Sequence, residues 1–125
     1  MKRSILSIAL VAVLAVVLAL PLGAAPTVSK RVVDEDGKTV VLVRVAASEF
    51  SVYGVDIEGG SIKDLKAPKG WVGITSGSRT IFRTGGDPVK SGASMTFRLY
   101  MADTDAKLAV TFRDDDNKER GAGSL

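Results

Sequence analysis

The sequence predicts an all-β protein, folded as a single antiparallel β-sandwich behind an N-terminal export segment. Three observations carry this prediction. No stretch after residue 26 has helical periodicity over a useful length. Two stretches near the C-terminus, 94–101 and 107–113, alternate cleanly between apolar and polar residues, as strands with one buried face do. Turn residues recur about every 8–12 positions, which separates several short strands.

The N-terminal segment has the organisation of a secretory signal peptide. Lys2 and Arg3 are followed by an apolar run over 5–20 that only Ser7 interrupts, and then by small residues. We predict residues 1–24 as the signal, with cleavage after Ala24 or Ala25. The alternative is a retained anchor, but the run reaches the roughly 20 apolar residues of a spanning helix only by including Pro21 and Gly23. The protein is therefore predicted to be secreted or to lie on the extracytoplasmic cell surface.

The first strands of the mature chain are predicted at 27–33 and 38–47. Asp36-Gly37 stands between these β-branched runs, which is a strong signal for a β-hairpin. The second strand is apolar on both faces in its first half, which predicts a central position in its sheet. The next strand, 50–57, changes phase beside Gly54, and we expect a β-bulge there.

Further strands are predicted at 61–67, 71–74 and 79–84, before the two clear ones at 94–101 and 107–113. The polar, glycine-rich stretch 117–125 is either a short edge strand or a loose tail. The sequence contains no repeat and no linker, so residues 25–125 are predicted as one domain. About seven strands at this spacing are typical of an immunoglobulin-like sandwich.

The composition excludes several classes of function. Removal of residues 1–24 leaves 15 basic and 14 acidic residues with interspersed signs, so the mature chain offers no basic surface typical of nucleic-acid binding. The chain has no histidine and no cysteine, which excludes Ser–His and Cys–His catalysis and metal sites built on those ligands. We expect no enzyme and no cofactor, although a Ser–Lys dyad or a carboxylate pair stays formally open. Abundant charge with one asparagine and no glutamine favours a thermophilic prokaryotic source.

An acidic segment, Asp114 to Glu119, resembles a calcium loop. Its candidate ligands are Asp114, Asp116 and Glu119, but the glycine at the sixth position and the distal glutamate of an EF-hand are missing, and Lys118 intrudes. A solvated turn between two edge strands is the favoured interpretation. The acidic hairpin at 34–36 could add ligands only if both loops meet at one end of the sandwich.

Trp71 is the single tryptophan and the one candidate for a carbohydrate-binding ring. A tryptophan that follows Pro-x-Gly at the start of a strand is more often a core anchor, which we favour. Lys63, Lys66 and Lys69 form a basic series, but on a regular strand this spacing does not place them on one face. They are interpreted as ordinary surface lysines.

The second half of the chain resembles cohesin-like and related sandwich domains of prokaryotic surface proteins. The residues that carry the resemblance begin with Ile62-Lys63-Asp64-Leu65, Pro68-Lys69-Gly70-Trp71 and 80–84, and they continue through Asp87-Pro88-Val89 to the alternating strand 91–99. The resemblance spans about 61–113, roughly half of the chain. It implies a sandwich fold and, more weakly, recognition of a protein partner.

The function expected from the sequence is a non-enzymatic exported module that binds an extracellular protein or assembles with itself. The contact would use a strand edge or a sheet face. One form of assembly is a filament in which the N-terminal strand, Thr27 to Val33, is exchanged between subunits. The alternative from another class is a carbohydrate- or calcium-dependent ligand module. Contact with a membrane is expected only if residues 1–24 are retained as an anchor.

Overall fold

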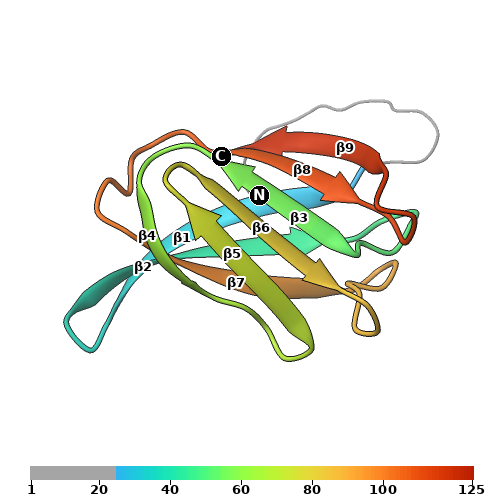
Figure 1. Cartoon of the computed structure of the whole chain (residues 1–125), viewed down its shortest axis with the longest axis horizontal. Coiled ribbons are helices and arrows are strands. Elements are labelled where there is room, and N and C mark those ends of the chain that lie inside the picture. The colour runs from blue at the N-terminus through green and yellow to red at the C-terminus, as the bar shows by residue number, and fades with distance from the viewer. Residues whose placement is uncertain (1–24) are drawn as a thin grey trace, which may run out of the picture.

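The computed structural model describes residues 25–125, which form nine strands and no helix (Figure 1). The predicted signal segment, 1–24, lies outside the described residues. Within the described part of the chain, nothing helical is long and apolar enough to cross a membrane. The strands are β1 Thr27–Glu35, β2 Lys38–Ala46, β3 Gly54–Glu58, β4 Ile62–Lys66, β5 Trp71–Ser76, β6 Arg79–Thr84, β7 Ser94–Met101, β8 Ala109–Arg113 and β9 Glu119–Ser124.

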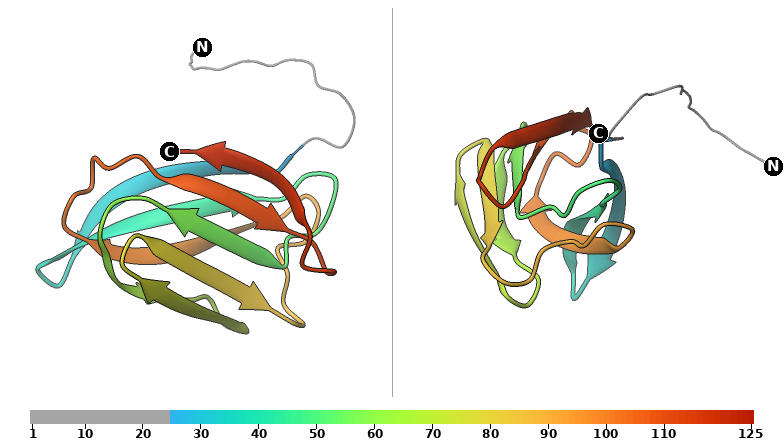
Figure 2. Two further views of the ribbon diagram at one scale, coloured as in Figure 1. Left: turned by 45° about the horizontal axis from the view of Figure 1, so that its top comes forward. Right: turned by 90° about the vertical axis from the view of Figure 1, so that its right-hand side faces the viewer.

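The strands form two antiparallel sheets that face each other in a β-sandwich-like arrangement (Figure 2). One sheet has the order β1-β2-β7-β4, and the other has the order β5-β6-β3-β8-β9. The all-β prediction is confirmed. The strand number is nine rather than about seven, in part because the C-terminal stretch pairs with β8 as β9 and is not a loose tail.

The predicted hairpin at Asp36-Gly37 is confirmed. Both residues have positive φ, 52° and 78°, the left-handed conformation that the central positions of a two-residue type I′ turn require. This turn joins β1 and β2, which pair along their whole length. The predicted central position of the second strand is also confirmed, since β2 lies between β1 and β7.

The hydrophobic core lies between the two sheets and is built by the alternation that the sequence displays. Phe97 of β7 is fully buried, with Phe82 at 4.8 Å and Trp71 at 5.0 Å between ring centroids. Leu99 of β7 and the alternate residues Val110 and Phe112 of β8 are buried in the same layer. Burial of large aromatic and branched side chains on one face of each strand therefore holds the sheets together.

The phase change predicted at Gly54 lies where β3 begins. Two successive residues stand opposite Arg113 there, because Gly54 pairs with it in register and the Tyr53 N–H donates to its carbonyl at 2.8 Å, as in a β-bulge. A register shift is also present in β4, where Ile62 pairs with Met101 and Asp64 pairs with Tyr100, the adjacent residue of β7. Lys63 is the extra residue, and it changes which side chains of β4 share a face.

Candidate functional site

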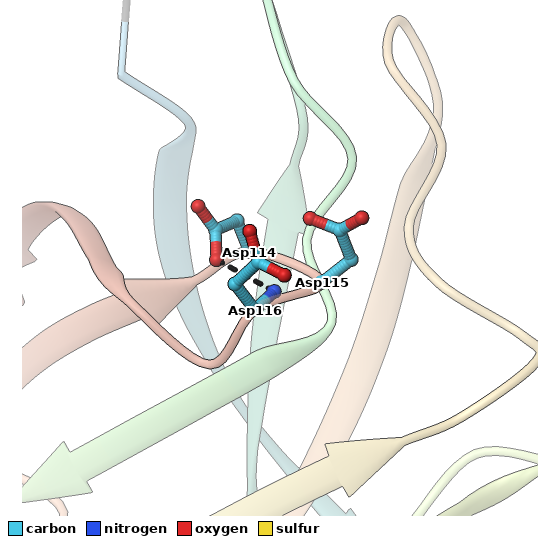
Figure 3. A group of neighbouring side chains, drawn as sticks. All are labelled: Asp114, Asp115 and Asp116. Carbon is cyan, nitrogen blue, oxygen red and sulfur yellow. Dashed lines mark hydrogen bonds between the residues drawn. The ribbon is translucent and has the colours of Figure 1, made fainter.

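The acidic loop between β8 and β9 brings three carboxylates together (Figure 3). One side-chain oxygen each from Asp114, Asp115 and Asp116 lies within 4.8 Å of the others. Of the predicted metal ligands, Asp114 and Asp116 are thus neighbours. Glu119 is not part of this group: it is paired in register with Arg113 and lines a hollow beside Asp56.

The Asp114 carboxylate is already occupied by its own loop. Its Oδ1 accepts hydrogen bonds from the backbone N–H groups of Asp116, at 2.9 Å, and Lys118, at 3.0 Å, while the Arg120 guanidinium lies 3.4 Å from Oδ2. The Lys118 N–H contributes most to lowering the pKa of Asp114; partial burial opposes this, and Asp116 N–H and Arg120 add to it. These contacts are those of a side chain that closes a turn.

The loop does not suit calcium, which takes six to eight oxygen ligands. Its best-placed carboxylate is hydrogen-bonded, and the Arg120 cation lies where a second positive charge would be repelled. The acidic hairpin at 34–36 is at the opposite end of the molecule in Figure 1 and in the left view of Figure 2, so it adds no ligand. The solvated-turn interpretation describes this loop better than a metal site.

Trp71 lies in the core and is 6% exposed. Its ring packs edge-on against Phe97, with an interplanar angle of 82°, and its Nε1–H donates a 2.7 Å hydrogen bond to the Asp87 carbonyl. Both the apolar face and the polar edge of the indole are therefore used inside the protein, and the ring offers no platform to a sugar.

The strongest electrostatic cluster surrounds Asp56, a residue that the sequence analysis did not single out. Asp56 lies in the middle of β3, the central strand of the five-stranded sheet, on the face away from the core. Its side chain is only 9% exposed, and it accepts hydrogen bonds from Arg83 Nη1 at 2.5 Å and Arg113 Nε at 3.0 Å. Arg79 lies 3.9 Å away.

Gly54 allows this convergence. It pairs in register with both Arg83 and Arg113, and an added Cβ would lie 3.0 Å from Arg83 Nη1 and 3.1 Å from Arg113 Cβ. Burial by itself raises the pKa of Asp56, but the hydrogen bonds and charges of the two arginines outweigh it, so the pKa lies below its ordinary value. An aspartate at the centre of an apolar strand was the sequence signal for this cluster, since a buried carboxylate requires partners.

A small hollow of about 130 Å³ beside Asp56 is the nearest feature to a carboxylate-lined cleft. Glu58 and Glu119 also line it, together with Arg79 and Arg113. A general acid needs a raised pKa, whereas that of Asp56 is lowered by its arginine partners. The cluster therefore supports a structural role in joining β3 to β6 and β8.

A larger groove, of about 540 Å³, lies between the β1–β2 hairpin and β4. It is lined by three lysines and by Tyr100, together with acidic side chains and one leucine: Glu35, Asp36, Lys38, Lys63, Asp64, Leu65, Lys66 and Tyr100. Of the series Lys63, Lys66 and Lys69, the first two line this groove beside the register shift in β4, and Lys69 does not. None of the three lysines of the groove forms an ion pair with another of the described residues.

The four edge strands of the two sheets differ in how they are protected. β1 carries four charged residues, and the ammonium group of Lys30 donates a hydrogen bond to the Thr104 carbonyl. β4 combines a bulge with charged residues, and β9 is covered where Ala25 and Val28 lie against its glycines. These are recognised devices against unwanted strand pairing.

β5 lacks the charges and the bulge of the other edges. Beside it lies β4 of the other sheet: Leu65 packs against Gly73, and the Thr75 hydroxyl donates to the Ile62 carbonyl at 3.4 Å. The six residues of β5, Trp71–Ser76, include no charge, no proline and no bulge. Val72 and Ile74 are 70% and 69% exposed on its outer face, the two most exposed large hydrophobic side chains among the described residues. Ile81 of β6 pairs with Ile74, so the three residues form a continuous apolar strip, which we call the β5 strip.

The backbone of β5 also has free hydrogen-bonding groups. A two-residue loop joins β5 to β6, which makes Ser76–Arg79, Ile74–Ile81 and Val72–Arg83 the hydrogen-bonded pairs of an antiparallel ladder. The N–H and C=O groups of Gly73 and Thr75 therefore point away from β6. Within the described part of the chain, neither residue makes a backbone hydrogen bond outside the strand ladders. Unpaired groups on an uncharged edge are suited to accept another strand.

Comparison with known proteins finds no match among family models, curated proteins or solved structures.

Proposed function

We propose that this chain is an exported, non-enzymatic binding and assembly module whose contact surface is the β5 edge and the β5 strip. The observation that carries the proposal is the combination on one strand of unpaired backbone groups, two exposed β-branched side chains and no charge. Main-chain hydrogen bonds supply affinity in strand addition, and alternate side chains supply specificity. The proposal includes an immunoglobulin-like sandwich and the cohesin-like resemblance of residues 61–113.

The β5 edge is better suited to this role than the N-terminal strand. No side chain of β1 is buried, and its inward positions include Lys30, so an exchanged β1 would bring few apolar anchors to a neighbouring subunit. β1 also pairs with β2 over its whole length, and those hydrogen bonds would have to open first. Filament formation by exchange of Thr27 to Val33 is therefore the less favoured form of assembly.

The proposal predicts that the exported chain is recovered in complexes larger than one chain. Ile74→Lys is expected to shift most of it to the size of a single chain, because an ammonium group on an edge strand opposes strand addition. The measurement is gel filtration of the exported fraction from cells that make each variant. Ala109→Lys is the matched control, since Ala109 is exposed on the outer face of the same sheet but distant from β5, and it should leave the elution unchanged. Wild-type chain that elutes as a free monomer would rule out this function.

The groove beside Tyr100 favours a second candidate, a module for acidic carbohydrate. Three lysines without ion-pair partners line the groove together with a ring that could stack on a sugar. Glu35 is paired with Arg98, so the lysines outnumber the two remaining carboxylates, Asp36 and Asp64, and the excess positive charge suits an acidic glycan. Polygalacturonate is expected to bind at low salt, and Lys66→Gln with Tyr100→Ala should weaken binding at least tenfold in isothermal titration. Neutral dextran is the control ligand. Equal heats for the two polymers would count against this candidate.

A further inference from the structure

We infer that the partner of the β5 edge is a second copy of the same chain, paired antiparallel about a two-fold axis that passes through Gly73. This inference rests on the proposed function and specifies its partner. The two copies would join their five-stranded sheets edge to edge into one sheet of ten strands.

The register follows from the directions of the backbone groups. Trp71, Gly73 and Thr75 direct their N–H and C=O groups to the free edge, apart from the Trp71 N–H, which donates to the Pro68 carbonyl at 3.0 Å. Pairing about Gly73 places Gly73 opposite Gly73 and Thr75 opposite Trp71 of the second copy. Each of these is then a hydrogen-bonded pair, as an antiparallel ladder requires. The only edge-facing donor left out is the one already satisfied within the chain.

The same register brings the apolar side chains together. Val72 lies directly opposite Ile74 of the second copy, and the symmetry repeats this pair, so the two β5 strips become one apolar surface. Cross-strand pairs of β-branched residues are among the contacts that stabilise sheets. Two-fold pairs about Val72 or about Ile74 would also place edge-facing residues opposite each other, but they would form two such pairs within β5 instead of three, and they would not bring Val72 opposite Ile74.

The charges that flank the strip are also complementary in this register. Ser76 lies opposite Gly70 of the second copy. Next to Ser76 in the same chain is Arg79, whose side chain is 55% exposed. Next to Gly70 is the carboxylate of Asp87. Each end of the interface therefore has an arginine of one copy and an aspartate of the other, although Arg79 also lies 3.9 Å from Asp56 of its own chain. Ala25 packs on β9, at the opposite edge of the sheet, so the N-terminal end of the described chain does not cover β5.

Sedimentation of the purified full chain tests whether it pairs with itself. The weight-average mass is expected to rise with concentration from that of one chain toward twice that value. Val72→Lys and Ile74→Lys should each remain at the mass of one chain over the same range, while Ala109→Lys behaves as wild type. Circular dichroism checks that the lysine variants are folded, which their exposed positions favour. A wild-type mass that stays monomeric up to millimolar concentration would overturn the inference.

Cysteine cross-linking tests the register, and the absence of native cysteine makes this test clean. In the inferred pair, Val72 and Ile74 of different copies form a non-hydrogen-bonded pair with Cα atoms about 4.5 Å apart, within the range of a disulfide. Identical positions lie on a diagonal about 7–8 Å apart, which is too far. A mixture of Val72→Cys and Ile74→Cys chains should therefore oxidise to a covalent dimer at least tenfold faster than either variant alone.

The outcomes separate the inference from the proposed function. Cross-linking that is faster in one single variant than in the mixture would overturn the Gly73 register. Equal rates in the mixture and in a mixture of Val72→Cys with Ala109→Cys would indicate random collision and overturn the pairing itself. If the purified chain is monomeric while the exported chain is still recovered in larger complexes that Ile74→Lys dissolves, the binding function stands and its partner is another protein.

Discussion

Replacement of Trp71 by alanine is expected to lower the free energy of unfolding by about 3–5 kcal/mol, the usual cost of truncating a buried aromatic residue. The side chain is 6% exposed, packs against Phe97 and uses its Nε1–H on the Asp87 carbonyl. The variant loses the ring contact and the hydrogen bond and leaves a cavity between the sheets. Urea denaturation followed by far-ultraviolet circular dichroism gives the measurement.

Two further variants separate the contributions at Trp71. Trp71→Phe keeps a ring against Phe97 but leaves the Asp87 carbonyl without its donor, so an intermediate loss is expected. Ile74→Ala, on the same strand but 69% exposed, should change the free energy of unfolding by no more than about 0.5 kcal/mol. A Trp71→Ala variant as stable as wild type would contradict the core assignment and restore Trp71 as a ligand-binding candidate.

The second large effect is expected at Asp56. Asp56→Ala should lower the free energy of unfolding by about 2–4 kcal/mol, because removing one partner of a buried ion pair leaves the other charge uncompensated. The arginines at this site are partly exposed, Arg113 by 22% and Arg83 by 31%, so water offsets some of the cost. Glu58→Ala is the matched control on the same strand, with an exposed side chain and an expected change within about 0.5 kcal/mol. The same urea experiment measures both variants, and equal stabilities would refute the anchor role.

The pH dependence of stability provides an independent readout for Asp56. Its pKa is lowered in the folded chain relative to the ordinary value of 3.8, so the unfolded chain takes up the proton first as the pH falls. The stabilisation is therefore fully present above the unfolded-state pKa and is lost as the pH falls through the lower folded-state pKa. Asp56→Asn should flatten this acid limb, so its stability difference from wild type narrows below about pH 4. A constant difference across the acid range would contradict the ion-pair explanation.

Local pattern was enough to predict most of the strands. In β7 and β8 the apolar period of two places Phe97, Leu99, Val110 and Phe112 on one face, and burial of that face follows from the hydrophobic effect. The Asp36-Gly37 turn was predictable because few residue pairs adopt left-handed backbone at both central positions. By contrast, the phase change near Gly54 does not show where the strand begins. Only the pairing of β3 with β6 and β8 decides that, and it places Tyr53 and Gly54 together opposite Arg113.

The candidate functional surfaces were much harder to predict from the sequence than the strands were. Arg83 and Arg113 are 27 and 57 residues from Asp56, and nothing local to any of them indicates that they meet. Lys38 of β2 meets Lys63 and Lys66 of β4 at one groove only because β2 and β4 both pair with β7. The acidic loop shows the converse: its carboxylates are neighbours in sequence and in space, yet the hydrogen bonds to Asp114 decide that it closes a turn.

The sequence by itself determined the all-β class, the β1–β2 hairpin and the alternating core, because turn conformation and side-chain burial depend on residues close together in the chain. It is also the basis for predicting export, because residues 1–24 contain basic residues, then an apolar run, and then small residues, as a signal peptide does. Only the tertiary structure decided which strands lie at sheet edges, because edge position depends on pairing between distant segments. The sequence Trp71–Ser76 reads as an ordinary strand, and its uncharged, unpaired edge becomes visible only once β6 occupies its other side.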